Sequence, residues 1–376
     1  MRLFSLALVL CTALVQLAAQ SLPGQIIRDP AHPQWFLRNG GDHVFICGPG
    51  DPEGFLFRGT RNADGTRTGD QMALIDKLIA QGGNSIYMQA VRSGGDGGPT
   101  ENPFVDSDPA KGVDPTILDQ WEEWFTRMDD HGILIYLFLY DDVSRPFGGG
   151  SEVPAGEEAF IQTLVDRFEH HRNLIWLVGE ETNEAYSNTR VRNIATRIRH
   201  HDDYDHLIGH HHGKGPSQGT WIEGGALDHY SMQNNVSSAA DVHADAIAAF
   251  ANGVAAGSSG NGYQTIYSEN TKRRGNNIGD TRNMIWEVAM GGLQVMRLGM
   301  DIAETPDEAL NACRYLQQFF EQTDFYTMVN ADALAYGDTT YVLADSGRSY
   351  IAYGLDAGGG LGLQDLPADS YDLDWT

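Results

Sequence analysis

Short apolar runs alternate with amphipathic helical patterns along most of the chain. The run 133–140 is apolar throughout, which is typical of a parallel strand buried on both faces. Segment 116–130 has helical spacing of apolar residues, with Pro115 near its start and Gly132 just past its end. The predicted strands are 44–47, 85–91, 133–140, 174–178, 206–210, 227–232, 264–268 and 293–298. The predicted helices are 70–80, 116–130, 156–170, 190–200, 241–251, 282–290 and 306–322.

Strands that alternate with helices over some 280 residues predict a (β/α)8 TIM barrel, which spans residues 20–325. The alternative is a doubly wound open sheet, but no glycine-rich phosphate loop follows the first strand. Past Asp324 the short strands 333–336, 340–343 and 349–353 are separated by Gly or Asp turns. They predict a small antiparallel, β-sandwich-like module over residues 326–376, which is either minimal or truncated.

The first residues have the pattern of a secretory signal peptide. Arg2 precedes the apolar run 3–17, and the small residues Ala18 and Ala19 follow, so we expect cleavage after Ala19. The run is too short to span a bilayer comfortably, since spanning takes about 20 apolar residues. Residues 1–19 therefore predict a secreted or periplasmic protein.

Net charge and cysteine spacing limit which partners, metals and cofactors we expect. The chain has 25 Lys and Arg against 51 Asp and Glu, a net charge of −26, which argues against nucleic acid and anionic membrane surfaces as partners. Two of the three cysteines, Cys47 and Cys313, lie outside the signal segment, and neither has metal-ligand spacing. We expect buried thiols, no metal and no cofactor.

Polar and aromatic residues follow nearly every predicted strand, where a barrel places its active site. The candidates for substrate binding are Asp51, Arg92, Tyr140, Asp141, Glu180, His210, His212, Trp221, Tyr230, Gln233 and Asn270.

Several of these candidates have a second interpretation. Trp221 and Tyr140 are candidates to stack on a sugar ring, with simple packing as the alternative. Arg92 either meets an acidic sugar or pairs with Asp141. The triplet 210–212 suggests a metal site, but neighbouring side chains on a strand point to opposite faces, so hydrogen bonding to sugar is favoured.

Two glutamates follow the fourth and seventh strands, and hydrolysis of a glycosidic bond needs two carboxyl groups. Glu181 shares a strand face with Ile175 and Leu177, whereas Glu180 shares one with the bulky Trp176, which fits poorly inside a barrel. We therefore expect Glu181 to point inward as the catalytic acid/base. Glu184 is a third candidate.

Glu269 is the candidate nucleophile, with a surface carboxylate as the alternative.

The segment 173–181 resembles the strand-four segment of clan A glycoside hydrolases, in which a Trp, an apolar stretch and a Gly precede Asn-Glu. The resemblance implies that Glu181 is the acid/base. Glu180 replaces the Asn that usually contacts the sugar 2-hydroxyl. The segment 266–269 resembles the nucleophile segment of strand seven, which implies the nucleophile role for Glu269.

Segments 32–37 and 45–55 resemble the apiosidase-like branch of these hydrolases. Segment 341–353 resembles a small β-domain, labelled collagen-binding, that often follows such barrels. Together they imply a retaining glycoside hydrolase.

The leading hypothesis is thus an exported retaining glycoside hydrolase that cleaves a plant or algal polysaccharide. One alternative is a non-catalytic carbohydrate-binding or surface protein on a barrel scaffold. Another is a polysaccharide lyase that uses Tyr230, the histidines and Arg92, which leaves the glutamate pair unexplained.

Overall fold

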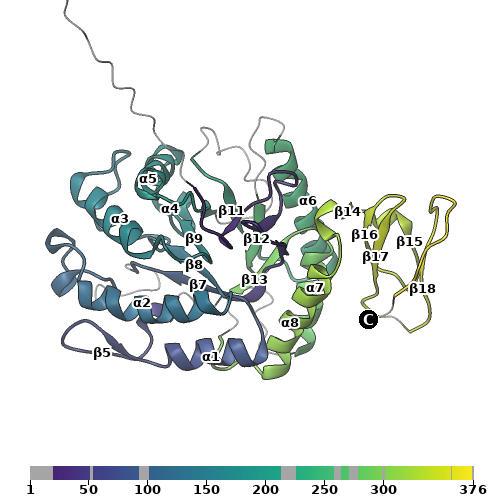
Figure 1. Cartoon of the computed structure of the whole chain (residues 1–376), viewed down its shortest axis with the longest axis horizontal. Helices are drawn as coiled ribbons and strands as arrows, with labels where there is room; N and C mark the ends of the chain where they lie inside the picture. The colour runs from purple at the N-terminus through teal and green to yellow at the C-terminus, as the bar shows by residue number, and fades with distance from the viewer. Residues whose placement is uncertain are drawn as a thin grey trace, which may run out of the picture.

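A parallel eight-stranded sheet surrounded by helices forms the body of the molecule (Figure 1). The computed structural model describes residues 20–50, 54–92, 101–212, 226–257, 264–270, 278–298, 301–356 and 358–374. The sheet strands are β4 (Cys47–Gly50), β7 (Ser85–Gln89), β8 (Leu134–Phe138), β9 (Leu174–Leu177), β10 (Ile208–His212), β11 (His229–Gln233), β12 (Gln264–Glu269) and β13 (Gln294–Leu298). Their order, β4-β13-β12-β11-β10-β9-β8-β7, confirms the predicted TIM barrel.

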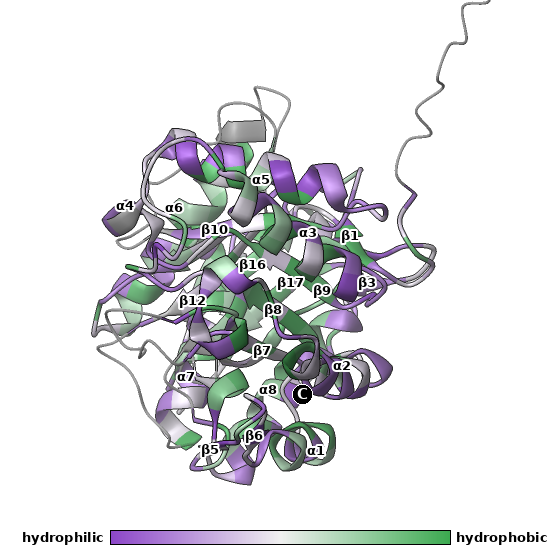
Figure 2. Ribbon diagram, turned by 90° about the vertical axis from the view of Figure 1, so that its left-hand side faces the viewer, coloured by the Kyte–Doolittle hydropathy of each residue, from purple (hydrophilic) through white to green (hydrophobic). Residues whose placement is uncertain are grey.

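Helices follow most of these strands and cover the outside of the sheet. They are α1 (Gln71–Gln81), α2 (Pro115–Asp130), α3 (Ala155–Phe168), α4 (Thr182–Ala185), α5 (Asn188–His201), α6 (Ala239–Gly257), α7 (Ile278–Ala289) and α8 (Asp307–Glu321). Figure 2 shows the central strands in apolar green and much of the outer surface of α2 in hydrophilic purple. Helices cover a parallel sheet on the outside, so its strands are apolar and the polar side chains lie on the outer faces of the helices.

The barrel closes where β4 meets β7, and the side chain of Asn84 makes that closure. The backbone N–H of Cys47 donates to Asn84 Oδ1 at 2.8 Å, and Asn84 Nδ2 donates to the carbonyl of Phe45 at 2.9 Å. The Asn84 N–H also donates to the Cys47 carbonyl at 3.1 Å. A side chain at Gly48 would meet the backbone N of Ser85 at 2.8 Å, so only glycine permits this close approach.

A small antiparallel sheet plugs the end of the barrel where the strands begin. It consists of β1 (Ile26–Arg28), β2 (Phe36–Arg38) and β3 (His43–Val44). Its apolar side chains pack with the inward side chains of the barrel strands in one buried cluster, among them Tyr87, Phe138 and Met296. The predicted first strand, 44–47, therefore divides between β3 of this plug and β4 of the barrel. A two-stranded hairpin, β5 (Thr60–Arg61) with β6 (Arg67–Thr68), precedes α1.

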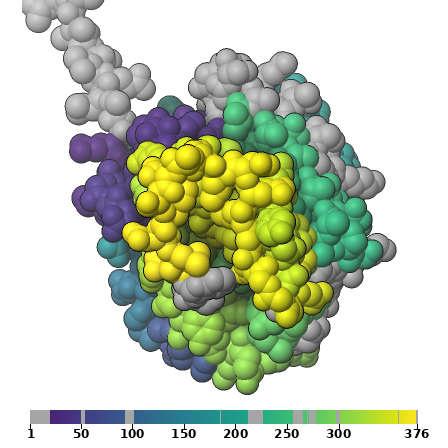
Figure 3. Space-filling view, turned by 90° about the vertical axis from the view of Figure 1, so that its right-hand side faces the viewer, coloured from purple at the N-terminus to yellow at the C-terminus, as the bar shows by residue number. Residues whose placement is uncertain are grey.

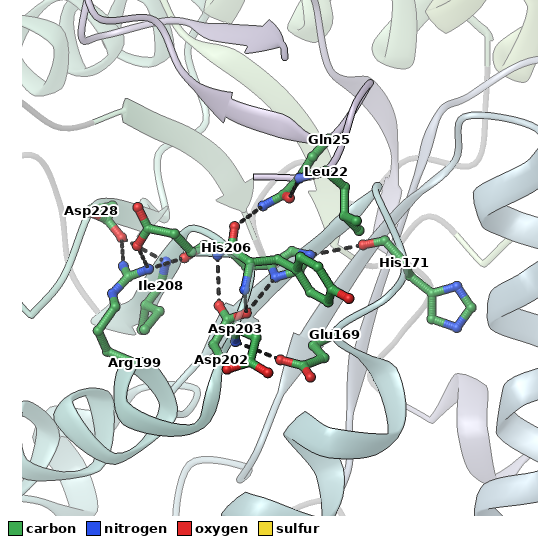
Figure 4. A network of polar contacts seen from close by, with 12 residues as sticks. Leu22, Gln25, Glu169, His171, Arg199, Asp202, Asp203, His206, Ile208 and Asp228 are labelled. Carbon is green, nitrogen blue, oxygen red and sulfur yellow. Dashed lines mark hydrogen bonds and ion pairs between the residues drawn. The ribbon is translucent and has the colours of Figure 1, made fainter. Parts of the chain in front are cut away.

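A buried polar network ties the connections at the same end of the barrel together (Figure 4). His206 Nδ1 lies 2.9 Å from Asp202 Oδ1, and both side chains are fully buried. His206 Nε2 donates to the carbonyl of His171 at 3.0 Å. Both ring nitrogens thus face oxygen atoms, so contacts on its two sides fix the orientation of the ring.

The C-terminal strands form the expected antiparallel module on one side of the barrel (Figures 1 and 3). They are β14 (Val329–Asn330), β15 (Ala335–Gly337), β16 (Tyr341–Asp345), β17 (Ser349–Tyr353) and β18 (Leu361–Leu363). They pair as the sheets β14-β16-β17 and β15-β18. The Tyr353 ring stacks on Trp286 of α7 at 4.7 Å, and Tyr341 stacks on His243 of α6 at 3.7 Å.

Cys47 and Cys313 are both buried and are not joined in a disulfide, as expected. The predicted signal segment, residues 1–19, lies outside the described residues. In the part of the chain that the structure describes, no helix is both long and apolar enough to cross a bilayer.

Replacing Asn84 with Ala leaves the Cys47 N–H and the Phe45 carbonyl buried without these partners where β4 meets β7. We expect a loss of about 2–4 kcal/mol in the free energy of unfolding, because each buried unsatisfied group costs about 1–3 kcal/mol. Urea unfolding measures it. Asn193→Ala removes a hydrogen bond to Ser151 at the surface and should cost less than about 0.5 kcal/mol. Equal stability of the two variants would contradict this account of the seam.

The Asp202 carboxyl links stability to pH. Burial alone would raise its pKa, but the hydrogen bond and charge of His206 hold the pKa below its ordinary value of 3.8. The carboxylate therefore contributes stability that is complete above pH 3.8 and is lost as the pH falls through the lowered folded-state pKa.

Asp202→Asn should cost about 1–3 kcal/mol near neutral pH, because the amide NH2 that replaces one carboxylate oxygen cannot accept from the buried N–H of His206. The difference in the free energy of unfolding between this variant and wild type should shrink as the pH falls below 3.8. Thermal unfolding across an acid pH series measures this difference. Asp203→Asn, at the exposed neighbouring position, is the control. A stability difference that does not change with pH would refute the stabilising role of the Asp202 carboxylate.

Candidate active site

A buried carboxylate, Glu180, lies just past the end of β9 among side chains from two other strands. Gln89, the last residue of β7, donates a hydrogen bond from Nε2 to Glu180 Oε2. Glu180 Oε1 lies 4.0 Å from His211 Nδ1 on β10. The His211 ring meets the inward rings of Tyr87 and Phe138 edge-on at 6.4 and 6.3 Å. Glu180, Gln89 and His211 therefore gather inside the barrel at its C-terminal end.

Further polar side chains line the same interior. Tyr136 Oη lies 2.5 Å from His229 Nε2, and Ser231 Oγ donates to Ser268 Oγ at 2.7 Å. Burial raises the pKa of the Tyr136 phenol, which keeps it a neutral hydrogen-bond donor. The interior thus carries polar side chains at both ends, since His229 packs beside Phe36 of the plug while Glu180, Gln89 and His211 gather at the other end.

Glu181 occupies a strained turn between β9 and α4. Its backbone is left-handed, with φ 32° and ψ 43°, a conformation that costs a non-glycine residue about 1–2 kcal/mol. Its N–H donates to His211 Nδ1 at 3.2 Å, which helps to hold the turn. Strain of this kind clusters at functional sites, where the surrounding structure maintains it. The turn places Glu181, a half-buried residue, directly after the buried Glu180 at the end of β9.

Side chains alternate between the two faces only within β9 itself, and Glu181 lies beyond its end. Ile175 and Leu177 lie in the inward cluster and Trp176 in the helix-side core, as expected. β9 ends at Leu177, however, and past that point Glu180 reaches the inward Gln89. The expectation that Glu180 shares the outward direction of Trp176 is thus corrected, because the turn replaces strand alternation with its own geometry.

Glu269 is the last residue of β12, and its side chain lies outside the described part of the structure. The register of β12 against β13 shifts between Tyr267 and Glu269. The register of β11 against β12 shifts between Met232 and Gln233. Irregularities of this kind re-aim side chains beside active sites. Gln233, which pairs in register with Glu269, is 6% exposed.

Three predicted binding residues lie on the helix side of the sheet instead of at the mouth. Tyr140 is fully buried and donates to Glu157 Oε1 at 2.8 Å. Glu157 also pairs with Arg190 at 2.7 Å. The rings of His210 and Tyr230 lie 6.1 Å apart in the outward layer, because they alternate with the inward His211 and Ser231.

Other predicted residues hold the loops that follow the strands. Arg92 pairs with Glu101 at 3.2 Å, and Asp141 Oδ1 accepts from the Ser144 N–H at 2.8 Å. Asn270 Nδ2 donates to the Val236 carbonyl at 2.9 Å. Asp51, Trp221 and the His212 side chain lie outside the described residues.

Sequence reasoning did not select Gln89 and His211 as site residues. A signal for both was present: Gln89 is two residues from Tyr87, and His211 is two residues from Gly209, at a position that alternation turns inward.

Comparisons with known proteins identify the family of this barrel. The family model "Apiosidase-like, catalytic domain" matches residues 70–293, more than half of the chain. No curated protein matches the chain.

The barrel is similar to three solved structures that share little sequence with it. A glycoside hydrolase family 5 protein from Bacteroides vulgatus ATCC 8482 has a TM-score of 0.61 and 14% identity, over 86% of this chain and 79% of that one. A β-mannanase from the blue mussel Mytilus edulis has a TM-score of 0.54 and 12% identity, over 77% and 97%. A family 5 mannosidase from Rhizomucor miehei has a TM-score of 0.55 and 10% identity, over 79% and 99%.

These likenesses show the fold, and the family match extends from α1 to the start of β13 and so includes the ends of β9 and β12 that carry the glutamates. The chain belongs to the apiosidase-like catalytic domain family and is a glycoside hydrolase.

Proposed function

We propose that the protein is an exported, retaining glycoside hydrolase that cleaves a plant or algal polysaccharide, with Glu181 as acid/base and Glu269 as nucleophile. The observation that carries the proposal is the strained turn at Glu181, which His211 holds beside the buried Glu180 and Gln89. β9 and β12, which end beside these two glutamates, are separated in the barrel by β10 and β11. Two carboxyl groups on separate strands can flank a sugar bound between them.

In the proposed mechanism, the Glu269 carboxylate attacks the anomeric carbon while Glu181 protonates the departing glycosidic oxygen. The product is a covalent glycosyl ester of Glu269. Glu181, now a carboxylate, then removes a proton from water, which attacks the same carbon and releases Glu269.

Glu180 stands where the related enzymes carry an asparagine. As a buried carboxylate it accepts hydrogen bonds only, and Gln89 Nε2 fixes one of its oxygens. We infer that the other oxygen accepts from a sugar hydroxyl. Its negative charge also favours the positive charge that develops on the sugar ring in the transition state.

The net charge of −26 supports a neutral glycan rather than a polyanionic one, which a strongly acidic protein would repel. The same argument disfavours the lyase, whose substrate carries uronic acids. Export rests on the signal pattern of residues 1–19.

Glu181→Gln and Glu269→Gln should both abolish most reducing-sugar release from a panel of plant and algal polysaccharides. Loss of a general acid/base costs about 10²–10⁴-fold in kcat, and loss of the nucleophile at least as much. Glu184→Gln, on the exposed side of α4, should stay within about twofold of wild type because surface substitutions perturb little.

Activity that survives either catalytic substitution would remove that residue's role. Glycan binding without sugar release by the wild type would favour the carbohydrate-binding protein instead.

His211→Ala should lower kcat by about 10-fold or more with little change in KM, because it removes the acceptor that positions the Glu181 turn. The pH profile of kcat should also change, since the acid/base is no longer held in one place. His211→Asn, which restores an acceptor oxygen, should recover part of the activity. Equal losses in kcat for the two variants, with an unaltered pH profile, would show that His211 serves stability alone.

A further inference from the structure

A carboxylate and two adjacent imidazoles converge near the start of β9, at the opposite end of that strand from Glu180 and Glu181. Glu122 lies in the middle of α2, while His170 and His171 lie in the turn between α3 and β9. Glu122 Oε1 is 2.9 Å from His170 Nε2 and 3.3 Å from His171 Nε2. Within the described ranges, this is the only set of three His, Cys, Asp or Glu whose ligand atoms lie within 4.8 Å of one another.

The separations are compatible with a tetrahedral zinc ion. With bonds of about 2.0–2.1 Å, ligand atoms at tetrahedral positions lie about 3.3–3.4 Å apart. The 3.3 Å separation of His171 equals that edge length, and the 2.9 Å separation of His170 is shorter, so the exposed His170 ring would move outward to bind the ion. Two histidines and one glutamate are also a ligand set that zinc uses, with water in the fourth position.

Neighbouring groups orient two of the three side chains. Arg167 Nε lies 3.2 Å from Glu122 Oε2, so Oε1 is the oxygen that faces the histidines. The His171 side chain is 3% exposed and packs near the rings of Phe125 and Phe168. In Figure 4 its imidazole points away from the network that binds its carbonyl. Its Nε2 is buried and has no hydrogen bond of good geometry among the described residues.

A second histidine pair in the chain provides an internal comparison. His201 Nε2 lies 2.7 Å from Glu158 Oε1, and Arg197 holds Glu158 Oε2 at 3.0 Å. The rings of His200 and His201 lie 4.9 Å apart, and His200 is exposed. Only one imidazole reaches the carboxylate there, so the composition is the same but the third ligand is missing.

We propose that Glu122 Oε1, His170 Nε2 and His171 Nε2 bind one zinc ion, with water as the fourth ligand. The ion would tie α2 to the turn that leads into β9, the strand that carries Glu180 and Glu181 at its far end. The proposed site is separate from the proposed hydrolytic chemistry.

Zinc binding to the full, untagged chain, stripped with a chelator and dialysed into metal-free buffer, tests the proposal by calorimetric titration. Wild type should bind one Zn²⁺ at this site. His170→Ala should weaken that affinity by more than about 100-fold, since even the loss of an outer partner costs 10–100-fold. The His170 side chain is 53% exposed, so this variant should fold. His200→Ala, the matched control, should bind like wild type.

Two further readouts do not depend on activity. Zn²⁺ should raise Tm for wild type and His200→Ala but not for His170→Ala, because an ion that binds only the folded state stabilises it. Co²⁺ should give the visible absorption of a tetrahedral site in wild type, and Glu122→Gln should weaken that absorption. No zinc binding by wild type, or an affinity that His170→Ala leaves unchanged, would overturn the proposal, as would an equal loss in His200→Ala.

Discussion

The seam between β4 and β7 is the constraint on which the rest of the structure depends. Parallel strands with apolar faces on both sides form either an open sheet or a barrel, and only closure brings the ends of β7, β9 and β10 around one mouth. Asn84 makes that closure with its side chain, and Gly48 allows the two strands to approach. The plug of β1–β3 then seals the other end with apolar side chains.

The pattern of apolar runs was sufficient to predict the order of the eight barrel strands, because burial on both faces leaves a signal in each strand, but it gave no sign of β1, β2 and α4. The strand 133–140, apolar throughout, contains β8 and was the clearest example. The first strand was less predictable, since 44–47 is one continuous apolar run although its two halves belong to different sheets. The closure by Asn84 could not be predicted either, because a single asparagine before a strand has no distinctive periodic signature.

The candidate site was predicted in position more than in detail. The ends of β9 and β12 were correctly identified as the places of the two glutamates in the barrel. Which of the neighbouring residues face the interior depends on the alternation of side chains along each strand. His210 and Tyr230 were selected for their chemistry, but their inward neighbours His211 and Ser231 occupy the interior. At Glu180 and Glu181 the alternation of side chains no longer holds, because a left-handed turn follows β9. Such a turn depends on the tertiary contact with His211 and is not encoded in the local pattern.

The most direct test of the account is the stereochemistry of the first product. Proton NMR at early times of hydrolysis, on the glycan that the protein cleaves, distinguishes the α and β anomers before they interconvert. Two successive displacements at the anomeric carbon, through a covalent ester of Glu269, predict the same anomeric configuration in the product as in the substrate. An inverted product would mean a single displacement by water, and it would contradict both the nucleophile role of Glu269 and the proposed mechanism.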